Sequence, residues 1–428
     1  MRNREPVTLE VVRLHADGYG VTADGKSAVI GALPGETVVA APFTRRKRRL
    51  FHRILSVETP SADRVTPICS AASICGGCSL QHLDPEVQVA RKQQVLLDEL
   101  AECAPEEILP PLCGPVSRYR SKARLGVKFV NAKERTLVGF REKMSPFVAD
   151  IETCEVLADP VGEMIPDISA LVDGMDARTR IPQIEVAVSE GIAALVIRHL
   201  DPLGSDDMAR LEAFAGDHPV HIYLQSGGPE TAARFYPTVG EERLVYRLPA
   251  HDIEMTFHPL DFTQVNQAIN RAMVDRAIAL LQPCPEDSIA DLFCGIGNFS
   301  LPLARRAGRV KGTEGVLSAV ERARENAARN AITNCEFDVA DLFADPLEID
   351  LSGHNKVLID PPRSGAEAVC EKLATDKVER VVYVSCNPVT LARDAKVLVN
   401  GGYQLKAAGV IDMFPHTTHT ESIACFVR

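Results

Sequence analysis

From about residue 255 onward, the chain repeats one pattern, in which an apolar run of strand length is followed by a segment with helical spacing. Strands that alternate with helices are typical of βαβ units, whose helical crossovers make the sheet parallel and cover both of its faces. Residues 251–428 are therefore predicted to form an α/β domain with a doubly wound, Rossmann-like sheet. The expected strands are 288–293, 309–313, 335–340, 356–359 and 380–384, and the clearest helix is 316–330.

The sequence Ser-Cys-Asn-Pro places Cys386 between the last of these strands and a helix expected from residue 389. Open α/β sheets bind ligands at the carboxyl ends of their strands, and a helix N-terminus favours a thiolate. Most intracellular cysteines are small core residues instead. Here, however, Glu421 follows 35 positions later in His-Thr-Thr-His-Thr-Glu and offers a carboxylate that can accept a proton. We predict that Cys386 is a nucleophile and Glu421 a general base.

A glycine-rich loop, Asp-Leu-Phe-Cys-Gly-Ile-Gly-Asn, follows the first strand and ends at Asn298. Gly295 and Gly297 allow a tight turn and the close approach of a ligand to the backbone. A lone Gly-x-Gly is weak support, but Glu314 ends the second strand, where a carboxylate can hold both hydroxyls of a ribose. A dinucleotide site normally has a third glycine, which Asn298 and its neighbour replace here. The pattern favours S-adenosylmethionine (SAM) over NAD.

Two further acidic residues end later strands of the predicted sheet. Asp341, after the third strand, can meet the amino group of an adenine, and Asp360 begins Asp-Pro-Pro-Arg after the fourth. In isolation, Asp-Pro-Pro is a rigid turn. Behind a SAM loop it indicates a pocket for a planar base. One alternative is an amino-group methyltransferase that uses this motif to hold an exocyclic nitrogen of adenine or guanine, a reaction that needs no thiol.

The N-terminus is charged and polar, and no apolar run approaches the roughly 18 residues that span a bilayer. We therefore expect a cytoplasmic protein without a membrane segment. Thiols stay reduced in that compartment, so the 12 cysteines indicate metal binding or catalysis and not a disulfide framework. No obligate protein partner is inferred.

Cys69, Cys75 and Cys78 lie close together in the sequence, and with a distant fourth thiol, best supplied by Cys154, they would make an all-cysteine site. Zinc competes with an iron-sulfur cluster because Cys-x2-Cys serves both, although zinc ribbons usually carry a second such pair, which is absent here. Apart from Cys386, the other cysteines are interpreted as packing residues: Cys103, Cys113, Cys284, Cys294, Cys335, Cys370 and Cys425.

Residues 6–58 alternate short β-rich runs with Gly and Pro turns, which predicts a small barrel. The first 60 residues carry ten Lys and Arg against six Asp and Glu, in a chain whose net charge is −11. The basic run 45–49 is therefore expected to contact phosphates locally. The next part has little regular structure over 60–83, a helix over 85–102 and an antiparallel sheet over 115–250. The expected domains are 1–58, 59–250 and 251–428, and helix 85–102 can pack on the last of them.

In this order, the motifs resemble those of the RNA (uracil-5-)-methyltransferases over essentially the whole chain. Residues 6–58 look like a TRAM domain, an OB-like RNA-binding barrel, and the cysteine run matches the family's iron-sulfur segment. The combination is most similar to the RlmD group, the bacterial 23S rRNA (uracil-5-)-methyltransferases. The matching motifs are Phe-x-Gln-Val-Asn from Phe262, the loop that ends at Asn298, Asp-Pro-Pro-Arg, Ser-Cys-Asn-Pro and His-Thr-x-His-x-Glu.

The resemblance implies SAM and a [4Fe-4S] cluster as cofactors, with Cys154 at the fourth ligand position. It implies 23S rRNA as substrate, with tRNA as an alternative. Phe262 would pack against uracil, and Gln264 and Asp360 would lie between base and cofactor. The residues that would contact SAM are Phe293, Asn298, Glu314 and Asp341.

The chemistry of uracil gives the thiol and the carboxylate their roles. Uracil C5 becomes a nucleophile once a thiolate adds at C6, so Cys386 would be a covalent catalyst and Glu421 would remove the C5 proton. His416 or His419 is an alternative base. The target uridine would be flipped out of a loop. A non-catalytic RNA-binding or redox-sensing protein is a further alternative, and it leaves the pairing of Cys386 with Glu421 unexplained.

Overall fold

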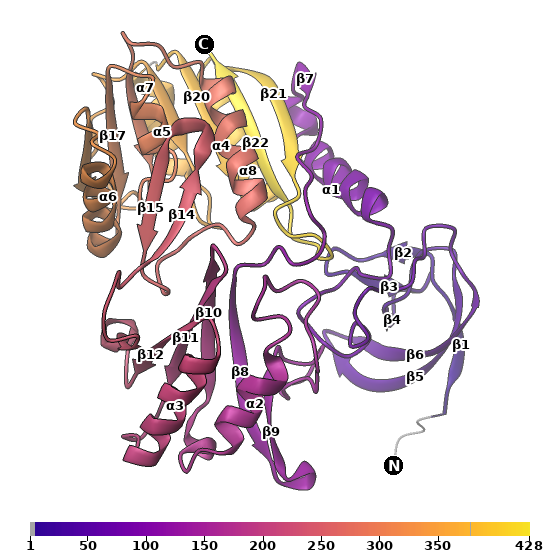
Figure 1. Cartoon of the computed structure of the whole chain (residues 1–428). Helices are drawn as coiled ribbons and strands as arrows, with labels where there is room; N and C mark the ends of the chain where they lie inside the picture. Colours follow the sequence, from indigo (N-terminus) through magenta and orange to yellow (C-terminus); the bar gives the residue numbers. More distant parts are fainter. Residues whose placement is uncertain (1–4, 377) are drawn as a thin grey trace.

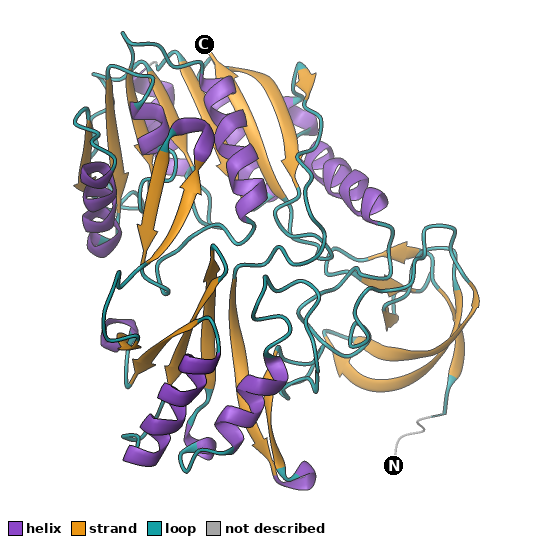
Figure 2. Ribbon diagram, viewed as in Figure 1, coloured by secondary structure: helices purple, strands orange, loops and turns teal. Residues whose placement is uncertain are grey.

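The computed structural model describes residues 5–376 and 378–428 of the chain. Three sheet-based parts follow one another along the chain, and the C-terminal sheet with its helices lies above the other two in Figure 1. Figure 2 shows that helices are concentrated around the C-terminal sheet and on one side of the central sheet. None of the helices within these residues combines the length and apolar character needed to cross a membrane.

The N-terminal part is a six-stranded sheet in the order β1-β5-β6-β4-β3-β2. The pairing of its two long strands, β5 and β6, shifts register at three places, and such bulges curve a sheet. Lys47 and Arg48 form the tip of the β5–β6 hairpin with positive φ, so the basic run lies at an exposed turn. The strands are β1 (Val7–Glu10), β2 (Arg13–Leu14), β3 (Tyr19–Val21), β4 (Ser27–Ile30), β5 (Thr37–Arg46) and β6 (Arg49–Thr59).

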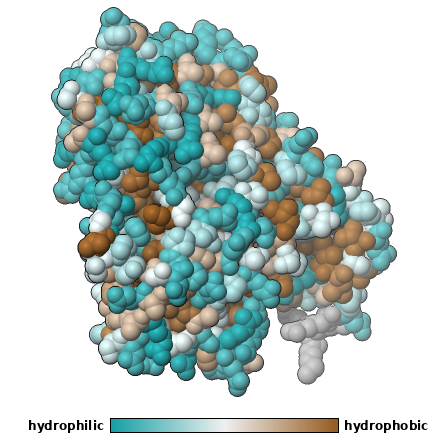
Figure 3. All heavy atoms as spheres, in the orientation of Figure 1, coloured by the Kyte–Doolittle hydropathy of each residue, from teal (hydrophilic) through white to brown (hydrophobic). Residues whose placement is uncertain are grey.

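Hydrophilic residues dominate the face of the molecule drawn in Figure 3, with apolar residues gathered over the region of the N-terminal sheet on the right. In or beside strands of that sheet, Val7, Val12 and Leu55 expose 42%, 51% and 60% of their surface. This part of the chain buries only small apolar clusters, so a large share of its apolar surface stays exposed.

Residues 60–84 contain neither helix nor strand, and helix α1 (Pro85–Glu99) begins directly after them. Asp84 caps α1 by accepting hydrogen bonds from the backbone N–H groups of Glu86 and Val87. The helix ends at residue 99, not 102, because the chain tightens into a 3-10 turn, η1 (Ala101–Cys103). Leu96 and Leu100 join the C-terminal core, so α1 packs on the C-terminal part.

The central sheet has the order β13-β12-β11-β10-β8-β9. Contrary to the antiparallel prediction, it is mixed, because helix α3 crosses over between β11 and β12 and makes that pair parallel. Its elements are β8 (Lys122–Val130), η2 (Asn131–Lys133), β9 (Arg135–Gly139), α2 (Ile165–Asp173), η3 (Arg178–Arg180), β10 (Gln183–Ser189), β11 (Ile192–Arg198), α3 (Ser205–Asp217), β12 (Val220–Gln225), η4 (Pro229–Thr231) and β13 (Ala233–Tyr236).

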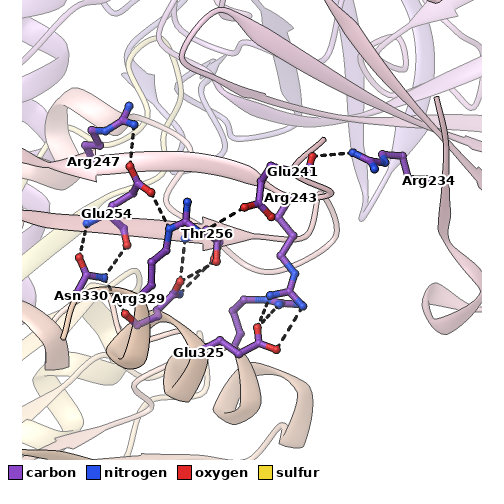
Figure 4. Close-up of polar contacts among 11 residues, drawn as sticks. Arg234, Glu241, Arg243, Arg247, Glu254, Thr256, Glu325, Arg329 and Asn330 are labelled. Carbon is purple, nitrogen blue, oxygen red and sulfur yellow. Dashed lines mark hydrogen bonds and ion pairs between the residues drawn. The ribbon is translucent and has the colours of Figure 1, made fainter. Parts of the chain in front are cut away.

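A separate hairpin, β14 (Leu244–Leu248), η5 (Pro249–His251) and β15 (Ile253–Phe257), joins the central part to the C-terminal part. Figure 4 shows the ion pairs that hold this hairpin against helix α6 (Leu317–Arg329). Arg329 donates from Nε to Glu254 at 2.6 Å, and Arg243 pairs with Glu325. The expected domain boundary at residue 250 therefore falls inside a hairpin that packs on the C-terminal part.

The C-terminal sheet has the order β18-β17-β16-β19-β20-β22-β21-β7. The five predicted strands are confirmed as parallel neighbours, with ends that agree within one residue. The expectation of a wholly parallel sheet is wrong, because β22 pairs antiparallel with both β20 and β21. The strands are β7 (Glu107–Ile108), β16 (Ser288–Leu292), β17 (Arg309–Glu314), β18 (Cys335–Val339), β19 (Lys356–Ile359), β20 (Arg380–Ser385), β21 (Gln404–Ile411) and β22 (Glu421–Val427).

Helices cover this sheet, and α5 (Ser300–Ala304), α6 and α7 (Glu367–Asp376) connect β16 to β17, β17 to β18 and β19 to β20, whereas the connection from β18 to β19, which is described throughout, contains no helix. Buried aliphatic side chains of strands β16 to β20 fill the space between sheet and helices, with exposures near zero for Ile289, Val357 and Val382. Two further helices pack on the sheet, α4 (Gln267–Leu281) and α8 (Pro388–Asn400).

Candidate active site

A cavity of about 930 Å³ opens where the parallel strands β16, β17, β19 and β20 end. Ligand sites of open α/β sheets occur at this edge, because loops from several strands converge there. The cavity brings together residues that lie up to 175 positions apart in the sequence, from Tyr246 to Glu421. All the predicted catalytic, SAM and uracil residues line it: Phe262, Gln264, Phe293, Asn298, Glu314, Asp341, Asp360, Cys386 and Glu421.

The glycine-rich loop adopts left-handed backbone conformations on the floor of this cavity. Phe293, Gly295 and Gly297 have φ angles of 62°, 53° and 94°. A non-glycine residue such as Phe293 rarely adopts this conformation, and such residues cluster at functional sites. Glu314 accepts hydrogen bonds from the backbone N–H groups of Gly295 (3.2 Å) and Val316 (3.0 Å), so its carboxylate is fixed against the loop.

Asn298 is held by two polar residues that sequence reasoning missed. Its Oδ1 accepts hydrogen bonds from the hydroxyl of Tyr246 (2.9 Å) and from Nδ2 of Asn270 (3.0 Å), and its Nδ2 donates to Oδ1 of Asn270 (2.9 Å). The hairpin and helix α4 therefore orient this amide. Tyr246 and Asn270 lie in segments of ordinary composition, so the sequence holds no signal that distinguishes them.

Three carboxyl groups influence one another at this edge of the sheet: Asp360 and Glu421 line the cavity, whereas Asp291 is fully buried and does not line it. Burial raises the pKa of Asp291 to about 7, and burial together with Asp291 raises that of Asp360 to about 8. Asp291 accepts a hydrogen bond from the hydroxyl of Ser300, while its Oδ1 has no partner. Burial and then Asp360 raise the pKa of Glu421 well above its ordinary value. These shifts favour the protonated form of each carboxyl group, and a nearby positive charge would oppose them.

Cys386 follows strand β20 and Glu421 begins the adjacent strand β22. The residues next to them, Ser385 and Ser422, are paired across the two strands, so thiol and carboxyl lie at one end of the sheet. Contrary to the expectation from the helix N-terminus, the pKa of Cys386 is raised to about 11, by burial, then by Glu421 and Asp360. Arg363 opposes this shift.

Of the two histidines considered as alternative bases, only His419 lines the cavity. Its Nδ1 lies 3.1 Å from a guanidinium nitrogen of Arg363, and burial lowers its pKa. His416 is buried on the other side of the loop, against helix α1, where Gln88 Nε2 lies 3.3 Å from its Nδ1.

The segment 260–265 forms the outer wall of the cavity, where Phe262 is 76% exposed. Asp261 fixes this segment from two sides. Arg322 of helix α6 donates from Nε to Asp261 Oδ2 at 3.2 Å, and the ammonium group of Lys122 in β8 donates to the Asp261 carbonyl. The backbone that carries the exposed Phe262 is therefore anchored at the preceding residue.

The thiols of Cys69, Cys75, Cys78 and Cys154 line a second, small cavity. Burial raises the pKa of Cys75 and Cys154 and raises that of Cys78 to about 11. Across residues 5–376 and 378–428, no three His, Cys, Asp or Glu side chains are placed to hold a metal ion. The four cysteines thus line the same small cavity, but their thiols are not placed as a complete set of metal ligands. Cys113 is exposed, so it is not the packing residue that was expected.

The side chains of the basic run are exposed at Arg45, Arg46, Lys47 and Arg48. Two residues of the run, Arg46 and Arg49, donate hydrogen bonds to other parts of the protein. Arg46 donates to the Met144 carbonyl at 3.1 Å. Arg49 is half-buried and donates to the Gly25 carbonyl (3.1 Å) and to the Tyr19 hydroxyl (3.0 Å). Among the described residues, no carboxylate forms an ion pair with Arg45, Lys47 or Arg48, so the hairpin tip exposes three cationic side chains.

Known proteins resemble this chain over its full length. The family model for tRNA (Uracil-5-)-methyltransferase matches residues 238–428. The 23S rRNA (uracil(1939)-C(5))-methyltransferase RlmD of Alcanivorax borkumensis is 50% identical, over 99% of this chain and 96% of that protein. The protein of the same name from Hahella chejuensis is 46% identical, over 99% and 98%. The crystal structure of Pyrococcus abyssi tRNA (uracil-54, C5)-methyltransferase with S-adenosyl-L-homocysteine matches with a TM-score of 0.79 at 25% identity, over 98% of this chain and 99% of that one.

Proposed function

The chain belongs to the RlmD family of RNA (uracil-C5)-methyltransferases, and on that premise we propose that it transfers a methyl group from SAM to C5 of a uracil in 23S rRNA. The observation that carries this proposal is that Cys386 and Glu421 share one cavity with the glycine-rich loop and Glu314. An amino-group methyltransferase needs no thiol at that place. The names of the full-length relatives favour the uracil equivalent to position 1939.

Residues of the loop and of the next two strands would bind SAM, which supplies an electrophilic methyl group. Glu314 would hold the ribose, because its carboxylate is already oriented by two backbone N–H groups. Asp341 would accept from the adenine amino group, with Phe293 and Asn298 alongside. A sulfonium cation in the cavity would lower the raised pKa values of Asp360, Cys386 and Glu421, because a positive charge favours the anionic form of each.

Uracil would enter between Phe262 and Asp360, with Gln264 next to it. The thiolate of Cys386 would form a bond to C6, and the electron pair of the C5–C6 double bond would pass to C5 and O4. C5 would then take the methyl group, and S-adenosylhomocysteine would leave. Glu421 would accept the C5 proton, after which the bond between C6 and sulfur breaks and the thiolate is restored.

We propose further that the four cysteines hold a [4Fe-4S] cluster, as the sequence resemblance implies. The four cysteines line one small cavity, which supports this proposal. Within the described residues, their thiols are not positioned to form a complete set of metal ligands. Four anionic thiolates require a cation to offset their mutual repulsion. Burial is the largest cause of the raised pKa values of Cys75 and Cys78, and the neighbouring cysteines add to it. Zinc remains the competing ion, since four cysteines also suit it.

The domain assignment is part of the proposal. Residues 1–58 would be a TRAM domain that binds RNA through the tip of the β5–β6 hairpin, and residues 59–250 a central iron-sulfur domain. Residues 251–428 would be the methyltransferase domain. The curved six-stranded sheet and the cations at its hairpin tip support the first assignment. A cytoplasmic location follows from ribosomal RNA as the substrate.

Transfer of labelled methyl groups to RNA tests the function. The intact protein should methylate a 23S rRNA fragment that contains the predicted uracil far faster than it methylates tRNA, and digestion should yield 5-methyluridine. A preference for tRNA would contradict the proposed 23S rRNA substrate but would be consistent with the proposed methylation of uracil C5. Full activity of Cys386→Ala, or label on an amino nitrogen, would exclude the proposed reaction.

A further inference from the structure

The loop 412–420 joins β21 to β22 and shapes one wall of the active-site cavity. It carries Phe414 and His419, which line the cavity, and it leads directly into Glu421. Most of the bonds that hold this loop come from residues before 120, far from it in the sequence. The loop that leads into the proposed base is therefore held by the N-terminal half of the chain.

Gln88 of helix α1 makes the central contact with this loop. Its Nε2 donates to the carbonyl oxygens of Leu80 (3.0 Å) and Leu83 (2.8 Å), and its Oε1 accepts from the backbone N–H of His416 (2.8 Å). Gln88 is only 2% exposed, and burying an amide is unfavourable unless it is hydrogen-bonded. His416 itself has a φ of 63°, a conformation that a side chain disfavours and that the surroundings must impose.

Lys92, one turn further along the same helix, holds the start of the loop. Its ammonium group donates to Asp412 Oδ1 at 2.6 Å and to the Phe414 carbonyl at 2.9 Å. The two charged side chains are 3% and 6% exposed, so this is a buried ion pair. Burying both charges costs free energy, which suggests that the pair is kept for the geometry that it imposes on the loop.

The cysteine segment adds two more bonds to the same place. The backbone N–H groups of Ser79 and Leu80, directly after Cys78, both donate to the His416 carbonyl at 2.9 Å. The Tyr119 hydroxyl donates to the Pro415 carbonyl at 2.9 Å. Helix α1 and the segment that carries the cysteines thus hold the loop together.

We infer that Gln88 and Lys92 are positioning residues, which hold the loop 412–420 so that Glu421 and His419 face the substrate. This inference rests on the proposed function, because it assumes that Glu421 acts on a uracil adduct. Neither side chain lines the cavity, so neither touches substrate or cofactor. Loss of either side chain should slow removal of the C5 proton by Glu421. SAM affinity should change little, because the proposed SAM residues lie on the other side of the cavity.

Two variants with matched controls test the inference. Gln88→Met removes the amide, and exposed Gln94→Met on the same helix is its control. Lys92→Met with Asp412→Leu removes both buried charges together, which avoids leaving one charge unpaired. Its control is Lys372→Met with Asp376→Leu, an ion pair of the same 2.6 Å length on helix α7. Tyr119→Phe is a milder third variant that removes a single hydroxyl.

SAM affinity, single-turnover methylation and the fraction of protein bound covalently to RNA are measured for each. We expect SAM affinity to stay within about twofold and turnover to fall about 10- to 100-fold, as a displacement of about 1 Å produces. The covalent fraction should rise, because release of the adduct is the impaired step. Variants that match their controls, or that lose SAM affinity and turnover in parallel, overturn the inference. A wild-type protein that forms no RNA adduct would instead refute the proposed function.

Discussion

Arg322 of helix α6 and Asp261 of the outer cavity wall form an ion pair of 3.2 Å in which both side chains are largely buried, at 12% and 16% exposure. Helix α6 also contributes Ser318 and Ala319 to the cavity, on the proposed SAM side. Asp261 directly precedes Phe262. The pair therefore connects the proposed cofactor side of the site with the proposed uracil side.

Arg322→Met should disturb uracil methylation more than SAM binding. Without the guanidinium, the segment 260–265 loses its link to helix α6, although Lys122 still donates to the Asp261 carbonyl and Ser121 to the Val265 carbonyl. The residue before Phe262 is then less firmly held. We expect kcat to fall roughly tenfold, with a small change in SAM affinity by calorimetry. Arg309→Met, which breaks the exposed pair with Glu336, is the control. Equal effects of the two substitutions would contradict the connection.

Glu421→Gln should accumulate a covalent protein-RNA adduct that survives denaturation. Cys386 would still add to C6 and C5 would still be methylated, but no carboxylate would remove the C5 proton, so the thiolate could not leave. A retarded band on a denaturing gel measures the adduct. Cys386→Ala should show no such band and should still bind SAM. If the Glu421→Gln protein methylates RNA and accumulates no adduct, a group other than Glu421 removes the C5 proton.

The reactivity of Cys386 should depend on pH and on its neighbours. Burial and the nearby carboxyls raise its pKa to about 11, so the thiolate, and with it the rate of alkylation by iodoacetamide, should increase as pH rises toward that value. Glu421→Gln removes a negative charge, which lowers the pKa of the thiol, so the profile should move to lower pH. Mass spectrometry of the Cys386 peptide follows this site alone. An unchanged profile would mean that the Glu421 charge does not act on the thiol, and a shift to higher pH would contradict the predicted sign.

Protein purified without oxygen should be brown and hold about four irons per chain if the cluster is present. Cys154→Ser and Cys75→Ser should lose the iron to similar extents, because each removes one of four ligands. Cys113→Ser, at an exposed cysteine, should keep it. Colourless protein with one zinc ion would identify the competing metal.

Replacement of Arg45, Lys47 and Arg48 by Gln should weaken RNA binding and reduce its salt dependence. Each lost phosphate contact removes roughly 0.7 to 0.9 from the slope of log affinity against log salt. SAM affinity should not change, since the hairpin tip is remote from the cavity lining. Filter binding at several salt concentrations gives the slope. An unaltered slope would mean that RNA does not contact these three cations.

The sequence predicts the local elements of the catalytic part well because their signals are local. In the run Lys356–Ile359, three apolar residues follow a lysine and end before Asp360, and the run forms β19 with the predicted ends. The glycine loop, Cys386 and Glu421 likewise stand in short motifs at strand ends. These motifs bring nine predicted residues to one cavity.

Long-range polar contacts could not be predicted in the same way. Gln88 and His416 are 328 positions apart, and neither an amide in a helix nor a buried histidine has a periodic pattern that reveals its partner. The parallel pair β11–β12 and the antiparallel β22 were missed for a related reason. The direction of a strand depends on how the chain returns to the sheet, and strand periodicity is the same in both directions.

The place of β22 between β20 and β21 has a consequence for the order in which the enzyme is built. Both neighbours leave the ribosome before β22 does, and until β22 emerges each lacks its partner on that side. The sheet can close only when the strand that begins with Glu421 enters the gap. The proposed base therefore arrives together with the strand that closes this part of the sheet, so a nascent chain would hold Cys386 without the proposed base.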